Sequence, residues 1–418
     1  MKSPILKHNS LVIFFLFLAA MTDSGCKKKQ DEPIPGKSLL MTLNFTDNYI
    51  NPKLGAIVFA SDSLGTAIAD TSFKGNGTVQ LYARPGIAVP TKFTLTIATW
   101  EPSMHNFVID MKSYTHVSPG EWTLKGHRPD TLGHITISLS NVPQSALILY
   151  ANSGFANLTT KIDHAIDLSY LDPDDLYINM EVNQVQKHLW ISDIHPGMTY
   201  NVDMSAAITP VFSNISLAGK YYEARIWGYK TADYENSLPI MTNFSLGSVP
   251  AGNQVQVPVM TEQFQGYHTE LKLVESWDSM ASYTCRVNGD IPAAFIKTDA
   301  RVASKTIYPA GKAEVHPTGT FTTTAVTWVF PAHNNQAFTW TIFGSNSMTA
   351  FALPNPSPVM FQMFPVLALD SLGFYNIELT DYTGIASYND FLKRRFDPAG
   401  PHSQDKMNAS SMISGQAK

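Results

Sequence analysis

The chain has 418 residues, a formal net charge of −5 and only 15% charged residues. Because phosphate neutralisation by basic side chains supplies most of the affinity for nucleic acid, this low charge and the lack of an Arg/Lys-rich stripe argue against a nucleic-acid partner. Aromatic residues make up 11% of the chain, and Thr, Val and Ile are frequent, a composition that favours β-sheets.

The first 25 residues have the pattern of an export signal. Lys2 and Lys7 give a positive start, and residues 11–21 (LVIFFLFLAAM) form an apolar core of 11 residues. This length is typical of a signal peptide and falls short of the roughly 18 residues that a membrane-spanning helix needs. Residues 1–25 are therefore predicted to be a signal peptide that is removed on export.

Small residues, Ser24 and Gly25, stand directly before Cys26. This Ser-Gly-Cys sequence resembles the lipobox of bacterial lipoproteins, in which the cysteine becomes the first residue of the mature chain and carries acyl groups such as palmitate. The resemblance implies that Cys26 is the lipidation site. The alternative is a plain secretory signal followed by a cysteine without a role.

Residues 26–38 are predicted to be an anchor and a flexible tether. The lysines at 27–29 would lie beside lipid headgroups, where each contributes about 1 kcal/mol if the lipid is anionic. The segment that follows, QDEPIPGKS, is too polar to pack. This start is similar to that of outer-membrane lipoproteins of the Bacteroidota. The similarity implies an exported protein held on the outer membrane by its lipid, on either the cell surface or the periplasmic face.

Short apolar runs bounded by turn residues recur along the rest of the chain. GAIVFASDSLG at 55–65 predicts an apolar strand, a type I turn and a returning strand. VLALDSLG at 366–373 repeats this pattern, which we attribute to convergence on a good hairpin turn. Two runs within 134–152 predict another strand pair. The best helix candidate is SYNDFLKRRF near the end, with Ser387 as its N-cap.

Strands at intervals of about 8 to 12 residues are typical of sandwiches and barrels. We therefore predict an all-β protein with several immunoglobulin-like β-sandwich modules in tandem behind the lipid-anchored tether. Turn-rich seams place the module boundaries. The predicted parts are a β-sandwich module at 39–128, a β module at 129–213, a β-sandwich module at 214–305, a β module at 306–396 and a disordered tail at 397–418.

Local signatures of catalysis are missing from the sequence, which has no HExxH, GxSxG, phosphate-binding loop, GxGxxG or CxxC. We therefore predict no catalytic residue, no cofactor and no enzymatic activity. Glu101, Glu275 and Asp278 lie near tryptophans, so an unrecognised hydrolase remains the less favoured alternative. Cys285 lies in the strand-like run SYTCRV, and we predict a buried thiol there rather than a nucleophile.

Two groups of residues have side chains of the kinds that bind metal ions. Alternate carboxylates such as Asp172, Asp174 and Asp175 can bind calcium, but this 172–175 loop lacks the central glycine and distal glutamate of a full calcium loop. We favour a solvated turn over a calcium site. Four histidines are spread along the chain without helical spacing, and we predict structural or solvated roles for them: His105, His116, His127 and His134. We therefore predict that the protein binds no metal ion.

The stretch RIWGYKTADYEN at 225–236 combines flat aromatic rings with carboxylate and amide groups. A sugar ring has an apolar face and a rim of hydroxyls, so this combination suits a glycan. The predicted ligand-binding residues are Trp227, Tyr229, Asp233 and Tyr234. The competing interpretation is that Trp227 packs in a core, as large aromatic residues often do in sandwiches.

The function predicted from these features is non-catalytic. We expect a cell-envelope lipoprotein that binds a polysaccharide, a glycoprotein or another extracellular ligand. The alternative is a structural adhesin or assembly subunit that contacts a protein partner through sheet edges. Clustered exposed aromatic residues in a groove would favour the first hypothesis, and a long unprotected edge strand would favour the second.

Overall fold

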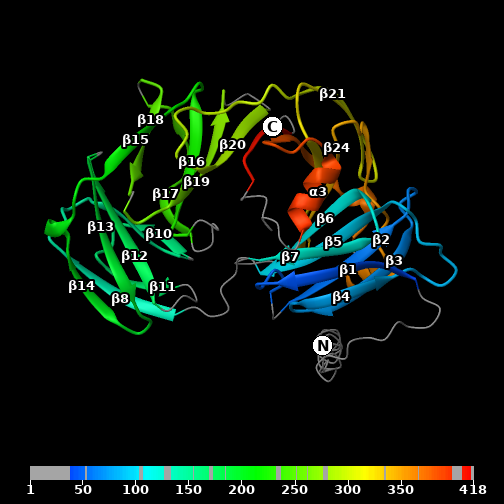
Figure 1. Ribbon diagram of the computed structural model, residues 1–418, viewed down its shortest axis with the longest axis horizontal. Coiled ribbons are helices and arrows are strands. Elements are labelled where there is room, and N and C mark those ends of the chain that lie inside the picture. Colours follow the sequence, from blue (N-terminus) through cyan, green and yellow to red (C-terminus); the bar gives the residue numbers. More distant parts are fainter. Residues whose placement is uncertain are drawn as a thin grey trace, which may run out of the picture. The chain divides into compact units, whose positions relative to one another are not determined.

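The chain is built almost entirely of β-strands, which confirms the all-β prediction (Figure 1). The computed structural model describes residues 38–51, 54–102, 107–126, 133–153, 155–168, 173–183, 185–231, 237–250, 252–260, 262–275, 281–333, 336–365, 367–397 and 407–415. The predicted signal peptide, Cys26 and the tether up to Lys37 lie outside these residues. From Ser38 onward the chain forms one compact unit with several sheets.

The first group of strands forms two packed layers. Its members are β1 (Leu39–Thr46), β2 (Gly55–Ser61), β3 (Ala67–Lys74), β4 (Gly77–Tyr82), β5 (Phe93–Pro102), β6 (Phe107–Val117) and β7 (Gly120–Lys125). The three-stranded sheet β4-β1-β7 covers one face of β3-β2-β5-β6. All of β2 is buried, because Val58 faces this layer and Phe59 faces a second core on the other side. Its unbroken apolar sequence reflects burial on both faces.

The second group is a sandwich with its own core. Its members are β8 (Gly133–Ser140), β9 (Leu147–Asn152), β10 (Phe155–Thr159), β11 (Asp163–Leu168), β12 (Asp174–Val182), β13 (Val185–Ile194), β14 (Thr199–Asp203) and the short helix η1 (Met204–Ala206). Sheet β10-β9-β12-β13 packs on sheet β11-β8-β14. Alternation along β12 directs Ile178 into this core and Tyr177 to the opposite face, which packs against the third group.

The third group follows directly. Its members are β15 (Val211–Ser216), β16 (Tyr221–Tyr229), β17 (Ser237–Ser248), β18 (Gln254–Val259), β19 (Gly266–Val274) and β20 (Ala281–Gly289). The two-stranded sheet β15-β18 covers one face of β17-β16-β19-β20. The core between them is shared with the second group, since it contains Leu149 and Tyr177 as well as Ile226 and Leu271.

The fourth group contains both α-helices of the described residues. Its members are β21 (Arg301–Tyr308), β22 (Lys312–Thr318), β23 (Thr323–His333), β24 (Gln336–Ser345), β25 (Ala350–Ala352), α2 (Pro358–Met363), η2 (Leu369–Ser371), β26 (Gly373–Tyr382), α3 (Tyr388–Phe396) and β27 (Ala409–Gly415). The predicted N-cap is confirmed, because the side chain of Ser387 accepts a hydrogen bond from the backbone N–H of Asp390. In the described part of the chain, no helix combines the length and apolar character required to cross a membrane.

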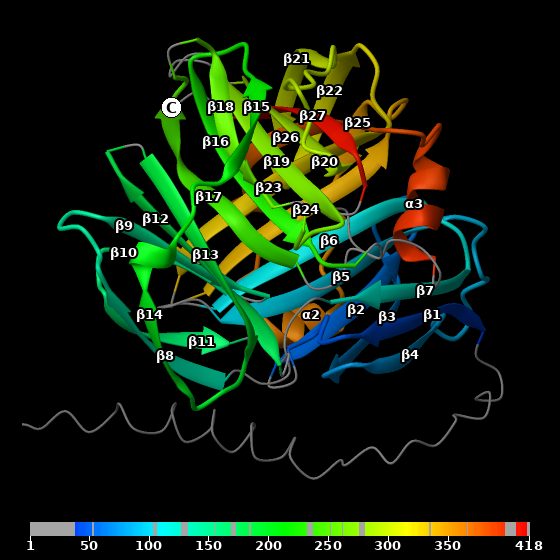
Figure 2. The same cartoon turned by 60° about the vertical axis from the view of Figure 1, so that its left-hand side comes forward.

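One large sheet joins three of the four groups (Figure 2). It has 12 strands in the order β17-β16-β19-β20-β27-β26-β23-β24-β6-β5-β2-β3. All its neighbours are antiparallel except β24 and β6, which run parallel with Phe343 opposite Tyr114. Helix α3 belongs to the fourth group but packs its buried Phe396 face to face on Trp122 of β7, at 3.9 Å between ring centroids. The four groups therefore share sheets and cores with one another and are not independent domains.

The structure corrects three local predictions. Residues 409–415, predicted to lie in a disordered tail, form β27 between β20 and β26. The first DSLG turn closes the hairpin β2-β3, whereas the second, at 370–373, overlaps η2 and leads into β26 without a preceding strand. The runs within 134–152 form β8 and β9, but these strands belong to opposite sheets and do not pair. The connection crosses the sandwich, which local patterning cannot distinguish from a hairpin.

Candidate functional site

The predicted aromatic site lies partly on β16. Trp227 is half-buried and packs against the ring of His268, with centroids 5.1 Å apart. Tyr229 is only 6% exposed, so its ring is not a platform on the surface. Asp233 and Tyr234 lie outside the described residues. Of the two predicted residues that the structure describes, Trp227 is half-buried and Tyr229 is buried.

Charged cross-strand pairs lie beside Trp227 on the same face of β16 and β19. Arg225 and Arg286 both approach Glu270, at 3.7 and 3.2 Å between nitrogen and oxygen. Lys272 lies 3.6 Å from Glu223. These residues are opposite one another in the strand register, which explains their pairing. The charged side chains next to Trp227 are therefore already paired with one another.

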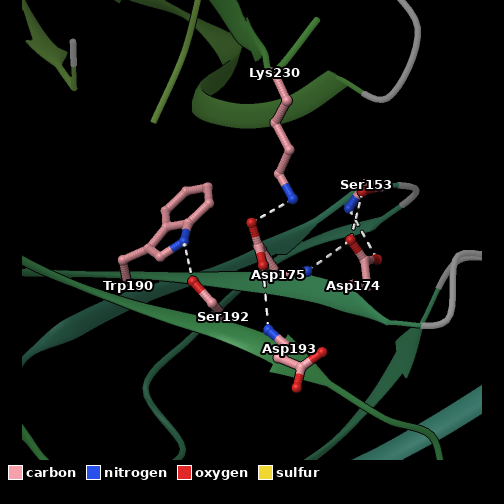
Figure 3. A network of polar contacts seen from close by, with 7 residues as sticks. All are labelled: Ser153, Asp174, Asp175, Trp190, Ser192, Asp193 and Lys230. Carbon is pink, nitrogen blue, oxygen red and sulfur yellow. Dashed lines mark hydrogen bonds and ion pairs between the residues drawn. The ribbon is translucent and has the colours of Figure 1, made fainter. Parts of the chain in front are cut away.

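The acidic cluster at 172–175 has a structural role as far as it is described (Figure 3). Asp172 lies outside the described residues. Asp174 is buried, and its carboxylate accepts hydrogen bonds from the Ser153 hydroxyl at 2.5 Å and from the backbone N–H of Asp175 at 2.8 Å. Hydrogen bonds of this kind compensate the burial of a carboxylate.

Asp175 points the other way, toward the third group (Figure 3). Its carboxylate forms an ion pair with Lys230 and accepts a hydrogen bond from the backbone N–H of Asp193 at 3.3 Å. The ammonium of Lys230 also lies 5.8 Å from the ring centroid of Trp190. Both aspartates are engaged by protein donors, and the described residues contain no group of three or more His, Cys, Asp or Glu side chains arranged to hold a metal ion.

The remaining candidates that the structure describes form no shared site. Glu275 forms an ion pair with Lys297, the side chain of Glu101 is not described, and Asp278 lies outside the described residues. Cys285 is a buried free thiol, as predicted, and burial raises its pKa, which disfavours the nucleophilic thiolate. His116 and His134 lie in different groups, while His105 and His127 fall outside the described residues.

A groove between the second and third groups has a lining that suits a small ligand better than any of these sites does. Its volume is about 610 Å³, and we call it the amide groove. Six polar side chains line it: Asn179, Glu181, Gln186, Asn214, Gln254 and Gln256. Its apolar lining includes the buried Leu149, Ile240 and Val255 and the half-buried Tyr222. Five of the six polar side chains are uncharged amides, so the groove offers many hydrogen bonds with little charge.

Strand alternation builds one wall of the amide groove. The β18 sequence QVQVPV buries Val255 and Val257 in the core and leaves Gln254 and Gln256 exposed. Asn214 of β15 is the register partner of Gln256, so two amide groups stand side by side across the strands. The alternation is visible in the sequence, but nothing local signals that these amides face another group.

The opposite wall is a relay of hydrogen bonds on β12 and β13. Asn179 donates to Gln186 at 3.4 Å, and Gln186 donates to Glu181 at 3.3 Å. Within the described residues, the buried Oδ1 atom of Asn179 has no hydrogen-bond partner. The same holds for the hydroxyl of Tyr177 and for Nδ1 of His188, the register partner of Asn179. A buried polar atom without a partner loses free energy on folding, and a bound ligand or water can satisfy it.

Comparison with known proteins adds little to this picture. No family model matches the chain, and no curated protein matches it in sequence. Among solved structures, a streptococcal ancillary pilin is similar with 9% identity and a TM-score of 0.15, over 60% of this chain and 94% of the pilin chain. The Bacillus anthracis TIE protein is similar with 9% identity and a TM-score of 0.12, over 83% and 77%. Similarities this weak carry no argument about function.

Proposed function

We propose that the protein is a non-catalytic, lipid-anchored envelope protein that binds a glycan in the amide groove. The observation that carries this proposal is the lining of the groove, in which five amides and one carboxylate surround an apolar floor. Sugar hydroxyls both donate and accept hydrogen bonds, and an amide side chain offers both functions in one group. Ligand sites typically combine apolar walls with a few such polar groups.

The low charge of the groove indicates a neutral glycan. Among the described residues that line it, Glu181 is the only charged one, and Gln186 already donates to that carboxylate. The half-buried ring of Tyr222 supplies an aromatic surface for the apolar face of a sugar. A volume of about 610 Å³ is in the range of small-molecule sites and would hold a short oligosaccharide.

The anchor completes the proposal. Acylation of Cys26 would hold the protein on a membrane, since each buried acyl methylene contributes about 0.8 kcal/mol. The three lysines that follow would add an attraction to anionic headgroups. The compact unit from Ser38 onward would then meet polysaccharide or glycoprotein glycans on the side of the membrane that carries the lipid, either the cell surface or the periplasmic face.

A panel of neutral polysaccharides and oligosaccharides tests this function. The purified protein should bind at least one neutral glycan, and a Trp227→Ala variant should bind it equally well, because Trp227 lies outside the amide groove. Loss of binding in Trp227→Ala would indicate that the glycan binds at Trp227 on β16, as the sequence predicts, and not in the amide groove. Absence of binding to every glycan of the panel would contradict the proposal.

A second candidate function rests on one edge strand. β21 pairs with β22 on one side, stands at the edge of its three-stranded sheet, and exposes Ile307 and Tyr308. An exposed strand edge can take up a strand from another protein. If the glycan panel gives no binding, a pull-down from envelope extracts that depends on β21 would support an assembly role.

A further inference from the structure

A second groove lies between the first and fourth groups, and none of its lining residues belongs to the two groups that form the amide groove. Its volume is about 600 Å³. One wall comes from the β5-β6 region, with Lys92, Thr94 and His116, and the other from Lys312 and the stretch around Leu353. The lining differs in character from the amide groove because it contains two lysines and a histidine. We call it the cationic groove.

A β-bulge shapes the wall on β5 and β6. Phe93 pairs with Val117 and Leu95 pairs with Tyr114, so the single residue Thr94 lies opposite both Thr115 and His116. His116 adopts a left-handed backbone conformation with φ of 56°. Bulges re-aim side chains, and left-handed backbone at a residue other than glycine costs energy and is enriched at functional sites. Thr94, Thr115 and His116 all line the groove as a result.

The charges of this groove are not balanced within the protein. Lys92 donates a hydrogen bond to the Ser118 hydroxyl at 2.8 Å, but neither Lys92 nor Lys312 has an ion-pair partner among the described residues. Asp62 is the single carboxylate among the described lining residues. It accepts hydrogen bonds from the backbone N–H groups of Leu64 and Thr66 in its own turn, at 2.9 and 2.8 Å. The groove therefore has a surplus of positive charge in a chain whose net charge is −5.

The remaining walls are fixed and partly apolar. The backbone N–H of Asn355 donates to the carbonyl of Gly65 at 3.0 Å, which fastens the DSLG turn to the fourth group. Ile342 and Leu353 are buried beneath the groove, and Met348 contacts the Thr115 hydroxyl at 3.8 Å. A ligand bound here would meet an apolar floor, hydroxyl groups and cationic ends.

From these observations we infer that the cationic groove binds a saccharide-sized organic anion, with its anionic groups paired with Lys92 and Lys312. Charge-assisted hydrogen bonds from lysine to a carboxylate or sulfate are stronger than neutral ones. The carbon skeleton of the ligand would lie against Ile342, Met348 and Leu353. This inference is independent of the proposed neutral-glycan site, because the two grooves share no lining residue.

Isothermal titration with an oligogalacturonate and a sulfated oligosaccharide tests this inference, with a neutral oligosaccharide of equal length as the control probe. We expect at least one anionic probe to bind and the dissociation constant to rise with added NaCl. A Lys92→Gln/Lys312→Gln variant should weaken binding at least about tenfold. A Lys272→Gln variant, which changes a lysine on β19 outside the groove, should bind as the wild type does.

Three results would overturn the inference. They are failure of both anionic probes to bind, equal binding of the neutral probe, and unchanged binding by the double-lysine variant. The anionic probes distinguish the source of the charge, since a preference for oligogalacturonate indicates a carboxylate ligand and the opposite preference a sulfate. Loss of neutral-glycan binding in a Gln256→Ala variant that still binds the anionic probe would show that the two sites are separate.

Discussion

The carboxylate of Asp175 on β12 forms an ion pair with the ammonium of Lys230, which follows β16, and so joins the second group of strands to the third (Figure 3). The same ammonium lies 5.8 Å from the ring centroid of Trp190, whose ring packs edge-on against Phe264 at 5.5 Å. The amide groove lies between these two groups. The ion pair therefore contributes to holding its two walls in place.

Replacing Lys230 with Met should lower the free energy of unfolding by about 1 kcal/mol, because both the ion pair and the cation–π contact are lost at a partly exposed site. Urea denaturation at low salt measures the change. Lys220→Met, at an exposed lysine of the same group, should leave stability within about 0.5 kcal/mol of the wild type. An equal loss in both variants would mean that the Asp175–Lys230 pair adds nothing specific.

Met412→Ala should lower the free energy of unfolding by about 2–5 kcal/mol, the usual range for emptying a core site. Met412 is buried in β27, which lies in the middle of the 12-stranded sheet. Thermal or urea unfolding measures the effect, with the exposed Met198→Ala as the matched control. A Met412→Ala protein as stable as the control would mean that β27 is dispensable, as a disordered tail would be.

The contrast between β2 and β27 explains how much of the fold the sequence could predict. GAIVFAS is continuously apolar and bounded by turn residues, so its burial follows from its composition. ASSMISG is short, small and half polar, and it becomes a strand only because β20 and β26 stand on either side. Its pairing depends on contacts more than 100 residues apart in the case of β20, which no local pattern records.

The candidate site shows the same limit. The Gln-Val alternation of β18 predicts which side chains point outward, and Ser387 at the start of SYNDFLKRRF predicts the cap of α3. However, the walls of the amide groove come from strands of two groups. The sequence drew attention to Trp227 because aromatic residues and carboxylates stand close together there. In the folded chain this tryptophan packs against His268 beside salt-bridged neighbours.

The free energy of unfolding should decrease at acidic pH, in part because of His188. Burial lowers its pKa below the ordinary value of 6.5. Above that pH the imidazole is neutral in the folded and unfolded chains. As the pH falls through 6.5 toward the lower folded-state pKa, the unfolded chain binds the proton more readily, so the free energy of unfolding decreases.

Replacing His188 with Gln should remove the decrease in unfolding free energy that protonation of this imidazole causes at acidic pH. The measurement is urea denaturation at pH 7.5 and pH 5.5 for the wild type, for His188→Gln and for His316→Gln, which changes an exposed histidine. The stability difference between the two pH values should shrink in His188→Gln and persist in His316→Gln. A difference of the same size in His188→Gln would refute this role for the buried imidazole.

Cys26→Ser should move the protein from the membrane fraction to the soluble fraction, because the proposed acyl chains supply the anchoring free energy. Fractionation of cells that express the wild type or the variant, followed by immunoblotting, measures the distribution. Cys285→Ser serves as the control, since that thiol is buried in β20 and takes no part in the proposed anchor. Persistent membrane association of Cys26→Ser would rule out lipidation as the anchor.

The central claim is that a neutral glycan binds in the amide groove, and its most direct test is the dissociation constant of one bound oligosaccharide for an Asn214→Ala/Gln256→Ala protein. These two residues form a cross-strand amide pair in the groove wall. Their loss should raise the dissociation constant about tenfold or more, while Asn201→Ala, at an exposed strand amide elsewhere, should leave it unchanged. An unchanged dissociation constant in the folded double variant would contradict the account.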